Sequence, residues 1–372
     1  MITLTPRKTI PLRLTLLTPV VAIALTLVIG AIIFATLGYH PGEALYQFFV
    51  APVSRPDQIA DLFVKACPLI IIASGLVFAY RANVWNIGAE GQMILGAMFA
   101  GWVALTLPDL SVWLMMPAMI AMGLLGGFLW AFMPAILKVR FNTNEILVSL
   151  MLTYVAAMLI DWTVRGPWRD PMSFGFPLTP TFSDAALISR MHLPGFGQLG
   201  QLHWGVVGAL VVSIGAWFVL QKTILGFQIK VMGDAPRAGR FAGFRPNVVT
   251  ILALTISGAA AGLAGMVEVS ANMGKLQPEI SFGQGFTAII VAFLARLNPI
   301  AVILAGLVVA LAEMGGDLAQ ISMAIPKVVT GVFKGILLFT LLAGETFNRY
   351  KVTFTIPKMV VFKGSEKDSH SD

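Results

Sequence analysis

The chain lacks most of the residues with which enzymes build reactive centres. Its 372 residues include one cysteine, Cys67, and four histidines. A single cysteine excludes a disulfide framework and a thiolate metal cluster, and the histidines have no metal-ligand spacing. The sequence contains no Gly-x-x-x-x-Gly-Lys-[Ser/Thr] segment, the loop that cradles ATP phosphates. No group of histidine, cysteine, serine or carboxylate has catalytic spacing, so we expect no enzymatic activity, no metal and no cofactor.

Charge is also scarce, and it lies almost entirely between apolar stretches. Only 12% of the residues are charged, 57% are hydrophobic and the mean hydropathy is +0.84. A helix needs about 20 mostly apolar residues to cross the hydrocarbon core, and the alternating pattern of a membrane barrel is missing. We therefore predict an all-α polytopic membrane protein with about ten transmembrane helices. The predicted spans, of which the eighth and ninth are short, are residues 15–37, 59–79, 90–107, 112–137, 144–164, 204–221, 247–271, 284–296, 299–314 and 325–343.

The basic residues predict how the chain is oriented. With the N-terminus in the cytoplasm, seventeen of the 25 lysines and arginines fall on the inner side, six on the outer side and two within spans. Cytoplasmic loops are enriched in basic residues, so we place both termini in the cytoplasm, loops 38–58 and 165–203 outside and loop 222–246 inside. This orientation explains the pI of about 9.6 without a nucleic-acid partner. Residues 1–345 form one predicted transmembrane domain, and residues 346–372 a cytoplasmic tail that we expect to be disordered.

Three polar segments interrupt the apolar pattern, and the first follows the second span. Asn86, Glu90 and Gln92 lie directly against an apolar helix. A carboxylate at that depth is costly unless it is paired or lines a wet cavity, which favours a functional role. The alternative is an ordinary turn, in which Asn86 caps a helix and Glu90 lies near its positive end.

The second polar segment precedes the fifth span. It reads Asn142-Thr143-Asn144-Glu145, and an Asn or Thr two or three residues before a Glu predicts a helix cap at Asn142 or Thr143. Glu145 is also close enough in sequence to pair with Lys138 or Arg140. The residues alone therefore favour a structural role here.

The third polar segment is the inner loop after the sixth span. Residues 235–243 are small and basic and predict two or three helical turns, with Asp234 as the N-cap and Pro236 in the first turn. Arg237, Arg240 and Phe241 would then share one face. Such a face fits either a protein partner or an anchor to lipid headgroups.

Taken in order and spacing, these segments resemble the inner-membrane permease subunits of bacterial ABC importers. The residues that carry the resemblance are Asn86-Ile87-Gly88-Ala89-Glu90-Gly91-Gln92, Asn144-Glu145 and the Gly233-Asp234-x-x-x-Ala238 loop. The family contains branched-chain amino acid, ribose-type sugar and nucleoside permeases, and this chain is most like its longer nucleoside-type permeases. The resemblance extends to about residue 345. Thr153 departs from the nucleoside-type pattern, which usually has Asn there.

The resemblance implies a set of partners. The inner loop would be the coupling helix that docks into a separate ABC ATPase, through Gly233, Asp234, Arg237, Ala238, Arg240, Phe241 and Gly243. A second permease chain, identical or similar, would complete the path, and an external substrate-binding lipoprotein would deliver a small-molecule substrate. Nucleosides or bases lead as the expected substrate, followed by simple sugars and then branched-chain amino acids. The expected location is the bacterial inner membrane.

An internal echo suggests where the substrate passes. Residues 88–100 partly resemble residues 282–295, which fits an inverted repeat of spans two to five and seven to ten, and equally fits chance. Half-spanning helices that begin with glycine expose backbone dipoles to a substrate, and a nucleoside needs aromatic stacking plus a few hydrogen bonds. The predicted substrate path comprises Trp85, Asn86, Glu90, Gln92, Glu145 and Phe286.

A rival from another class is an ion-coupled carrier. Such a carrier needs ionisable residues deep in the membrane. Lys65, Asp161, Glu268 and Glu313 are the candidates, and most of them lie near span ends.

Close contacts between helices are predicted by glycines four residues apart. The pairs are Gly123 and Gly127, Gly258 and Gly262, and Gly331 and Gly335.

Overall fold

The chain forms two compact units, which are described separately. They are Met1–Ile29 together with Ile336–Asp372, and Gly30–Gly335. The computed structural model describes residues 2–6, 12–193, 197–326, 328–329, 331–333, 335–336, 339–340, 343–344 and 350–354.

The smaller unit joins the two ends of the chain. Strand β1 (Ile2–Pro6) pairs antiparallel with β4 (Tyr350–Phe354), and Ile2 lies opposite Phe354. The hydroxyl groups of Thr26 and Thr340 are 2.6 Å apart and share a buried hydrogen bond. Residues 355–372, the larger part of the predicted tail, lie outside the described residues.

The helices coincide with the predicted spans. Six described helices are long and apolar enough to cross a membrane, so the chain is a mostly helical, multi-pass membrane protein. The tenth predicted span, residues 325–343, lies only partly within the described residues. The helices at the other nine are α1 (Leu12–Thr36), α3 (Pro56–Arg81), α4 (Ala89–Thr106), α5 (Val112–Phe141), α6 (Glu145–Arg165), α7 (Gly205–Lys222), α10 (Pro246–Val267), α11 (Gln284–Leu294) and α12 (Pro299–Met323).

Shorter elements lie between the spans. They include short strands as well as helices, since β2 (Arg190–Leu193) and β3 (Gly197–His203) form a hairpin, as β1 and β4 form a pair. These strands fall outside the predicted spans, where water can satisfy an open sheet edge. The remaining short elements are α2 (Pro41–Phe49), η1 (Ala51–Val53), η2 (Asp184–Ala186), α8 (Ile224–Asp234), α9 (Pro236–Phe241) and a π-helical turn, η3 (Glu268–Met273).

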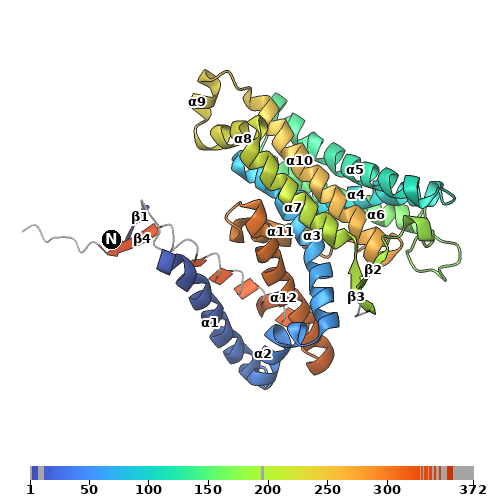
Figure 1. The fold of residues 1–372 in the computed structure, drawn as a ribbon, viewed down its shortest axis with the longest axis horizontal. Coiled ribbons are helices and arrows are strands. Elements are labelled where there is room, and N and C mark those ends of the chain that lie inside the picture. Colours follow the sequence, from blue (N-terminus) through green and yellow to red (C-terminus); the bar gives the residue numbers. More distant parts are fainter. Residues whose placement is uncertain are drawn as a thin grey trace, which may run out of the picture. The chain divides into compact units, whose positions relative to one another are not determined.

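Helix α10 forms the centre of the larger unit, where it packs against α3, α4 and α5 (Figure 1). Glycines allow this close approach. A Cβ on Gly262 would lie 2.8 Å from the Gly127 backbone, and a Cβ on Gly127 would lie 2.7 Å from the Gly262 nitrogen. The first two predicted glycine pairs are therefore contact sites. For the third pair, the described residues show no contact, because no described atom lies within 4 Å of a Cβ built on Gly331 or Gly335.

The two spans predicted to be short differ in outcome. Helix α11 has 11 residues, as expected, whereas α12 has 25 residues and continues well past residue 314. Gly315 and Gly316 lie just past the predicted end of that span. In the structure Gly315 is helical, and it serves the approach of α2, because a Cβ there would lie 2.5 Å from the Phe48 Cα. Phe48 packs with Phe34 and Phe333 in a buried aromatic cluster.

Candidate functional site

Helix α11 is too short to cross the membrane. Its 11 residues span about 16 Å, roughly half of the hydrocarbon core. It begins after Gly283, whose φ of +83° is a left-handed conformation that glycine adopts readily. Half-spanning helices of this kind occur where transporters hold their substrates.

Glu90 of α4 lies at the start of α11. Its carboxylate accepts hydrogen bonds from the Gly283 N–H at 2.8 Å and the Gly285 N–H at 2.6 Å, and the Ser281 hydroxyl donates a third. The positive end of α11 compensates the charge of a carboxylate that is only 7% exposed. A Cβ on Gly285 would lie 2.5 Å from the Glu90 Cα, so this approach requires glycine. Glu90 therefore contacts the start of α11, which belongs to the segment 282–295 that resembles residues 88–100 in the sequence.

A cavity of about 420 Å³ opens beside Glu90. Phe286 lines it together with Tyr154, and Thr153, the departure from the nucleoside-type pattern, lies in the same wall. We call it the Glu90 pocket. Of the six residues predicted to form the substrate path, Glu90 and Phe286 line it.

Asn86 and Gln92 belong to a separate buried network. Their side-chain amides exchange two hydrogen bonds of 2.8 and 3.0 Å, and Asn86 also donates to the Ser257 hydroxyl at 2.9 Å. The Asn86 side-chain oxygen accepts the Gly88 N–H as well, so this residue shapes the turn that leads into α4. Buried polar groups of this kind are stable because every partner is supplied by the protein.

Glu145 and Trp85 lie on another side of the same turn. Glu145 pairs with Lys138 at 2.6 Å and accepts the Trp85 N–H at 3.4 Å. The Trp85 ring stacks on Phe293 and packs at a tilt against Tyr80, with ring centroids 5.7 and 5.4 Å away. Neither residue is among those that line the Glu90 pocket.

The predicted cap before Glu145 is wrong by one or two residues. Asn144 is the N-cap of α6, because its side-chain oxygen accepts the Ile146 N–H at 3.0 Å. Asn142 instead ends α5 with a left-handed φ of 53°. Asparagine suits both positions, so spacing alone did not show which residue ends one helix and which begins the next.

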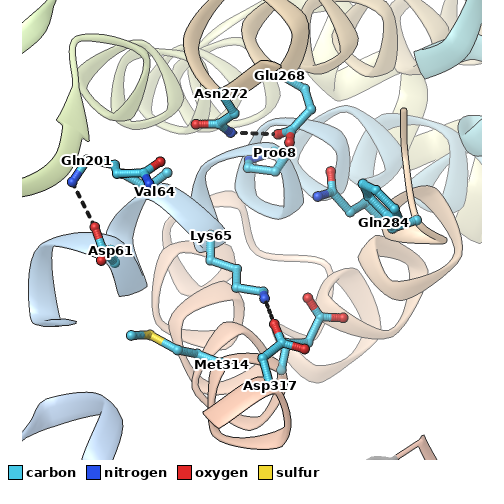
Figure 2. A pocket seen from close by; sticks show the side chains of 12 residues that line it. Asp61, Val64, Lys65, Pro68, Gln201, Glu268, Asn272, Gln284, Met314 and Asp317 are labelled. Atoms are coloured by element: carbon cyan, nitrogen blue, oxygen red, sulfur yellow. Dashed lines mark hydrogen bonds and ion pairs between the residues drawn. The ribbon is translucent and has the colours of Figure 1, made fainter. Parts of the chain in front are cut away.

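A larger polar cavity of about 530 Å³ lies between α3, α12, the start of α11 and the π-helical turn η3 (Figure 2). We call it the Lys65 pocket. Lys65 forms an ion pair with Asp317, and on the opposite wall Asn272 donates to Glu268 at 3.0 Å (Figure 2). Sequence reasoning considered Lys65, Glu268 and Glu313 only for ion coupling, and it missed Asp317 and Asn272. Asp161, its fourth candidate, pairs with Arg165 and does not line this pocket.

The predicted coupling loop forms two short helices. Asp234 is the last residue of α8 rather than the N-cap of α9, because α8 extends through the residues that were expected to be loop. Ala235 takes the N-cap position, and Gly243 follows α9 with a φ of +82°. Gly233 is required where α8 meets the end of α3, since a Cβ there would collide with the Arg81 carbonyl.

The candidate coupling residues of α9 face solvent. Arg237, Ala238, Arg240 and Phe241 are exposed, and the Phe241 ring reaches 94%. Gly239 is buried against Met232. An exposed aromatic ring on the same short helix as two exposed arginines is a surface that a partner can cover.

Comparison with known proteins places the chain among transporters. A family model described as branched-chain amino acid transport system / permease component matches residues 58–342. The chain belongs to this permease family. It is 32% identical to a glucose ABC transporter permease of Haloferax volcanii, over 94% of this chain and 93% of the relative. It is also 27% identical to a guanosine ABC transporter permease of Bacillus subtilis, over 92% and 96% of the two chains. A nucleoside ABC transporter permease of Lactococcus lactis shares 26% identity over 94% and 95%.

These relatives agree with the motifs in the sequence. The chain is a permease subunit of an ABC transporter, which works with a separate ATPase and a substrate-binding protein. As a permease it is a multi-pass protein of the cell membrane.

Proposed function

We propose that the permease forms the translocation path of an importer for nucleosides or related bases. The observation that carries the proposal is the Glu90 pocket, where aromatic rings of Phe286 and Tyr154 meet polar groups at the start of a half-spanning helix. A nucleobase needs a ring to stack on and a few hydrogen bonds. The guanosine and nucleoside permeases among the relatives support this substrate class.

A simple sugar is the second candidate. The relative with 32% identity is a glucose permease, and Thr153 in the wall of the Glu90 pocket departs from the nucleoside-type pattern. Branched-chain amino acids rank third. The family description names them, but the positive end of α11, which suits a carboxylate, is bonded to Glu90.

The substrate class is testable on the complete transporter. Vesicles that contain this chain, its partner permease and the ATPase, supplied with the cognate binding protein, should take up labelled guanosine only when ATP is present. Uptake of glucose but not guanosine would transfer the proposal to sugars. Uptake driven by an ion gradient without the ATPase would instead establish the ion-coupled carrier.

For topology we propose ten spans with both termini in the cytoplasm. The α8–α9 segment and the β2–β3 hairpin lie at opposite ends of the helices of the larger unit, which supports opposite sides for loops 222–246 and 165–203 (Figure 1). In intact cells, an impermeant thiol reagent should label a cysteine placed at Phe174 and spare one placed at Arg240. The reverse pattern would overturn the orientation.

For coupling we propose that α9 docks into the ATPase and that a second permease chain, identical or similar, completes the path. The exposed ring of Phe241, with the exposed Arg237 and Arg240 on the same short helix, supports the docking surface. Phe241→Asp should abolish copurification of the ATPase and reduce uptake at least about tenfold, because a hot-spot aromatic contributes about 2 kcal/mol or more. Phe174→Asp is the matched control, since this ring is 95% exposed and lies in a loop predicted to be external. Normal ATPase binding by the Phe241 variant would contradict docking through α9. The exposed face of α9 would then be explained as an anchor to lipid headgroups.

We propose that the residues of the predicted substrate path have different roles. Phe286 would contact the substrate, and Glu90 would hold the start of α11 in place. Asn86, Gln92 and Glu145 would set the turn before α4, on which Trp85 lies. The inverted repeat stays a proposal, supported by the contact between the start of α4 and the start of α11.

A further inference from the structure

Among the described residues that line it, the Lys65 pocket has more acidic than basic side chains. Asp61, Glu268 and Asp317 supply carboxyl groups to its wall, and Lys65 supplies an ammonium group. Lys65 is already paired with Asp317. A dissolved anion that enters this cavity therefore meets repulsion, whereas neutral and cationic solutes do not.

Groups that can accept hydrogen bonds lie in and behind the wall of the pocket. Gln284 lines the cavity, and its buried side-chain oxygen has no hydrogen-bond partner among the described residues. On the opposite wall, Glu268 and Asn272 lie in the π-helical turn η3, a deviation from α-helix that is frequent at functional sites. A cavity rich in acceptors suits a ligand rich in donors, such as hydroxyl and amino groups.

An anion could bind nearby at the N-terminus of α11, but a carboxylate of the protein already lies there. The N-terminus of α11 presents free N–H groups and a positive dipole, which usually bind phosphate or carboxylate. Here the Glu90 carboxylate accepts hydrogen bonds from the N–H groups of Gly283 and Gly285. A phosphorylated solute would have to displace a buried carboxylate to reach them.

Phe282 connects the two cavities. It lines both the Lys65 pocket and the Glu90 pocket, its ring is 59% exposed, and its φ of 46° is a left-handed conformation that non-glycine residues rarely adopt. A solute that occupies the Lys65 pocket therefore lies next to the proposed path and against an accessible aromatic ring.

We propose that the Lys65 pocket is a binding station on the substrate path and selects neutral, hydroxyl-bearing solutes against their phosphorylated forms. The assignment rests on the proposed function, because it takes the pocket to be part of an import path. Carboxylates and amide oxygens accept hydrogen bonds from sugar hydroxyls, and Phe282 offers a stacking surface for a base or a sugar ring. The excess carboxylates repel a phosphate group.

Cysteine modification measures the charge of the pocket directly. The background is Cys67→Ser, which retains the donor to the Gly205 carbonyl, and Met314→Cys places one thiol in the pocket wall. The complete transporter in intact cells is treated with cationic trimethylammonioethyl and anionic sulfonatoethyl methanethiosulfonates, both impermeant. The cationic-to-anionic rate ratio should exceed that at the exposed control Phe174→Cys by about tenfold. Adding Asp61→Asn should lower the ratio toward the control value, because one carboxylate is removed from the wall.

Protection by solutes tests the binding station. Millimolar guanosine or glucose should slow modification at Met314→Cys, and guanosine monophosphate or glucose 6-phosphate should not. Equal ratios at the two positions, no modification from outside, no protection by either neutral solute, or equal protection by a phosphorylated solute would each overturn the proposal. The rate ratio does not depend on which solute is imported, so a failure of the proposed substrate class remains distinguishable.

Discussion

Two regions of the larger unit use opposite means to keep helices together. Around α10, helices α4 and α5 approach through glycines until backbone touches backbone. Beside the Lys65 pocket, charged and amide side chains of α3, α12 and the start of α11 line a cavity of about 530 Å³. The first arrangement leaves no room for a solute, and the second provides it. Stability is therefore expected to depend on the glycine contacts, and solute handling on the pocket.

The largest expected effect is a loss of stability when the glycine contact is filled. Gly262→Ala introduces a Cβ within 2.8 Å of the Gly127 backbone, and neither backbone can move without separating α5 from α10. We expect a loss of about 3 kcal/mol, measured as a lower thermal midpoint in detergent. Gly215→Ala on α7 is the control, because no described atom lies within 4 Å of its Cβ and its midpoint should not fall. Equal midpoints for both variants would remove the contrast between the two regions.

The next effect concerns Glu90, at the boundary of the two regions. Glu90→Gln replaces an acceptor oxygen by an amide that faces backbone N–H groups at the start of α11. We expect a loss of about 2 kcal/mol and slower uptake, because one buried donor is left without a partner. ATPase copurification and the affinity of the binding protein should be unchanged. Glu43→Gln, at an exposed position on α2, should have no effect. Wild-type stability and uptake in Glu90→Gln would contradict the positioning role.

A pH-dependent effect is expected at His203, on the strand that also carries Gln201 of the Lys65 pocket. Burial, with a smaller contribution from Arg190, lowers the pKa of His203 from 6.5 to about 4, and its Nδ1 accepts the Gly205 N–H. The folded protein therefore holds His203 neutral, and the unfolded chain binds a proton first as pH falls below 6.5. The contribution of His203 to the free energy of unfolding is complete above that pH and decreases toward pH 4. The free energy of unfolding should fall by about 1 kcal/mol between about pH 7.5 and 5.5.

The matched variant is His203→Asn, which retains an acceptor for Gly205 but does not titrate in this range. As the pH is lowered over the same interval, the thermal unfolding midpoint of the wild type should fall more than that of the variant. Parallel curves would show that folding does not lower the pKa of His203.

The smallest effect is expected for the ion pair of the Lys65 pocket. The Lys65 and Asp317 side chains are 32% and 55% exposed, so solvent screens their attraction. Asp317→Asn should change stability by less than about 1 kcal/mol. A loss as large as that of Gly262→Ala would show that the pair holds α3 and α12 together rather than lining an open cavity.

The sequence was a good guide to the helices and a partial guide to the site. Long apolar runs gave nine helices close to their predicted places, since hydropathy is a local property. The end of α12 was predicted too early, because the helix continues through Gly315, where it contacts Phe48. The predicted path residues turned out to occupy three environments. Glu90 and Phe286 line a pocket, Asn86 and Gln92 bond each other, and the others lie against Lys138 and Phe293.

The sequence by itself determined that this chain crosses a membrane, carries no ATP-binding loop and belongs with ABC permeases. Composition and short motifs suffice for these conclusions, because membrane insertion and phosphate binding depend on residues close together in the chain. Only the tertiary structure decided that the Glu90 carboxylate bonds the start of a half-spanning helix 193 residues further along. It also brought Lys65 to Asp317 and opened the cavity beside them. Contacts at such separations follow from helix packing, which no local pattern specifies.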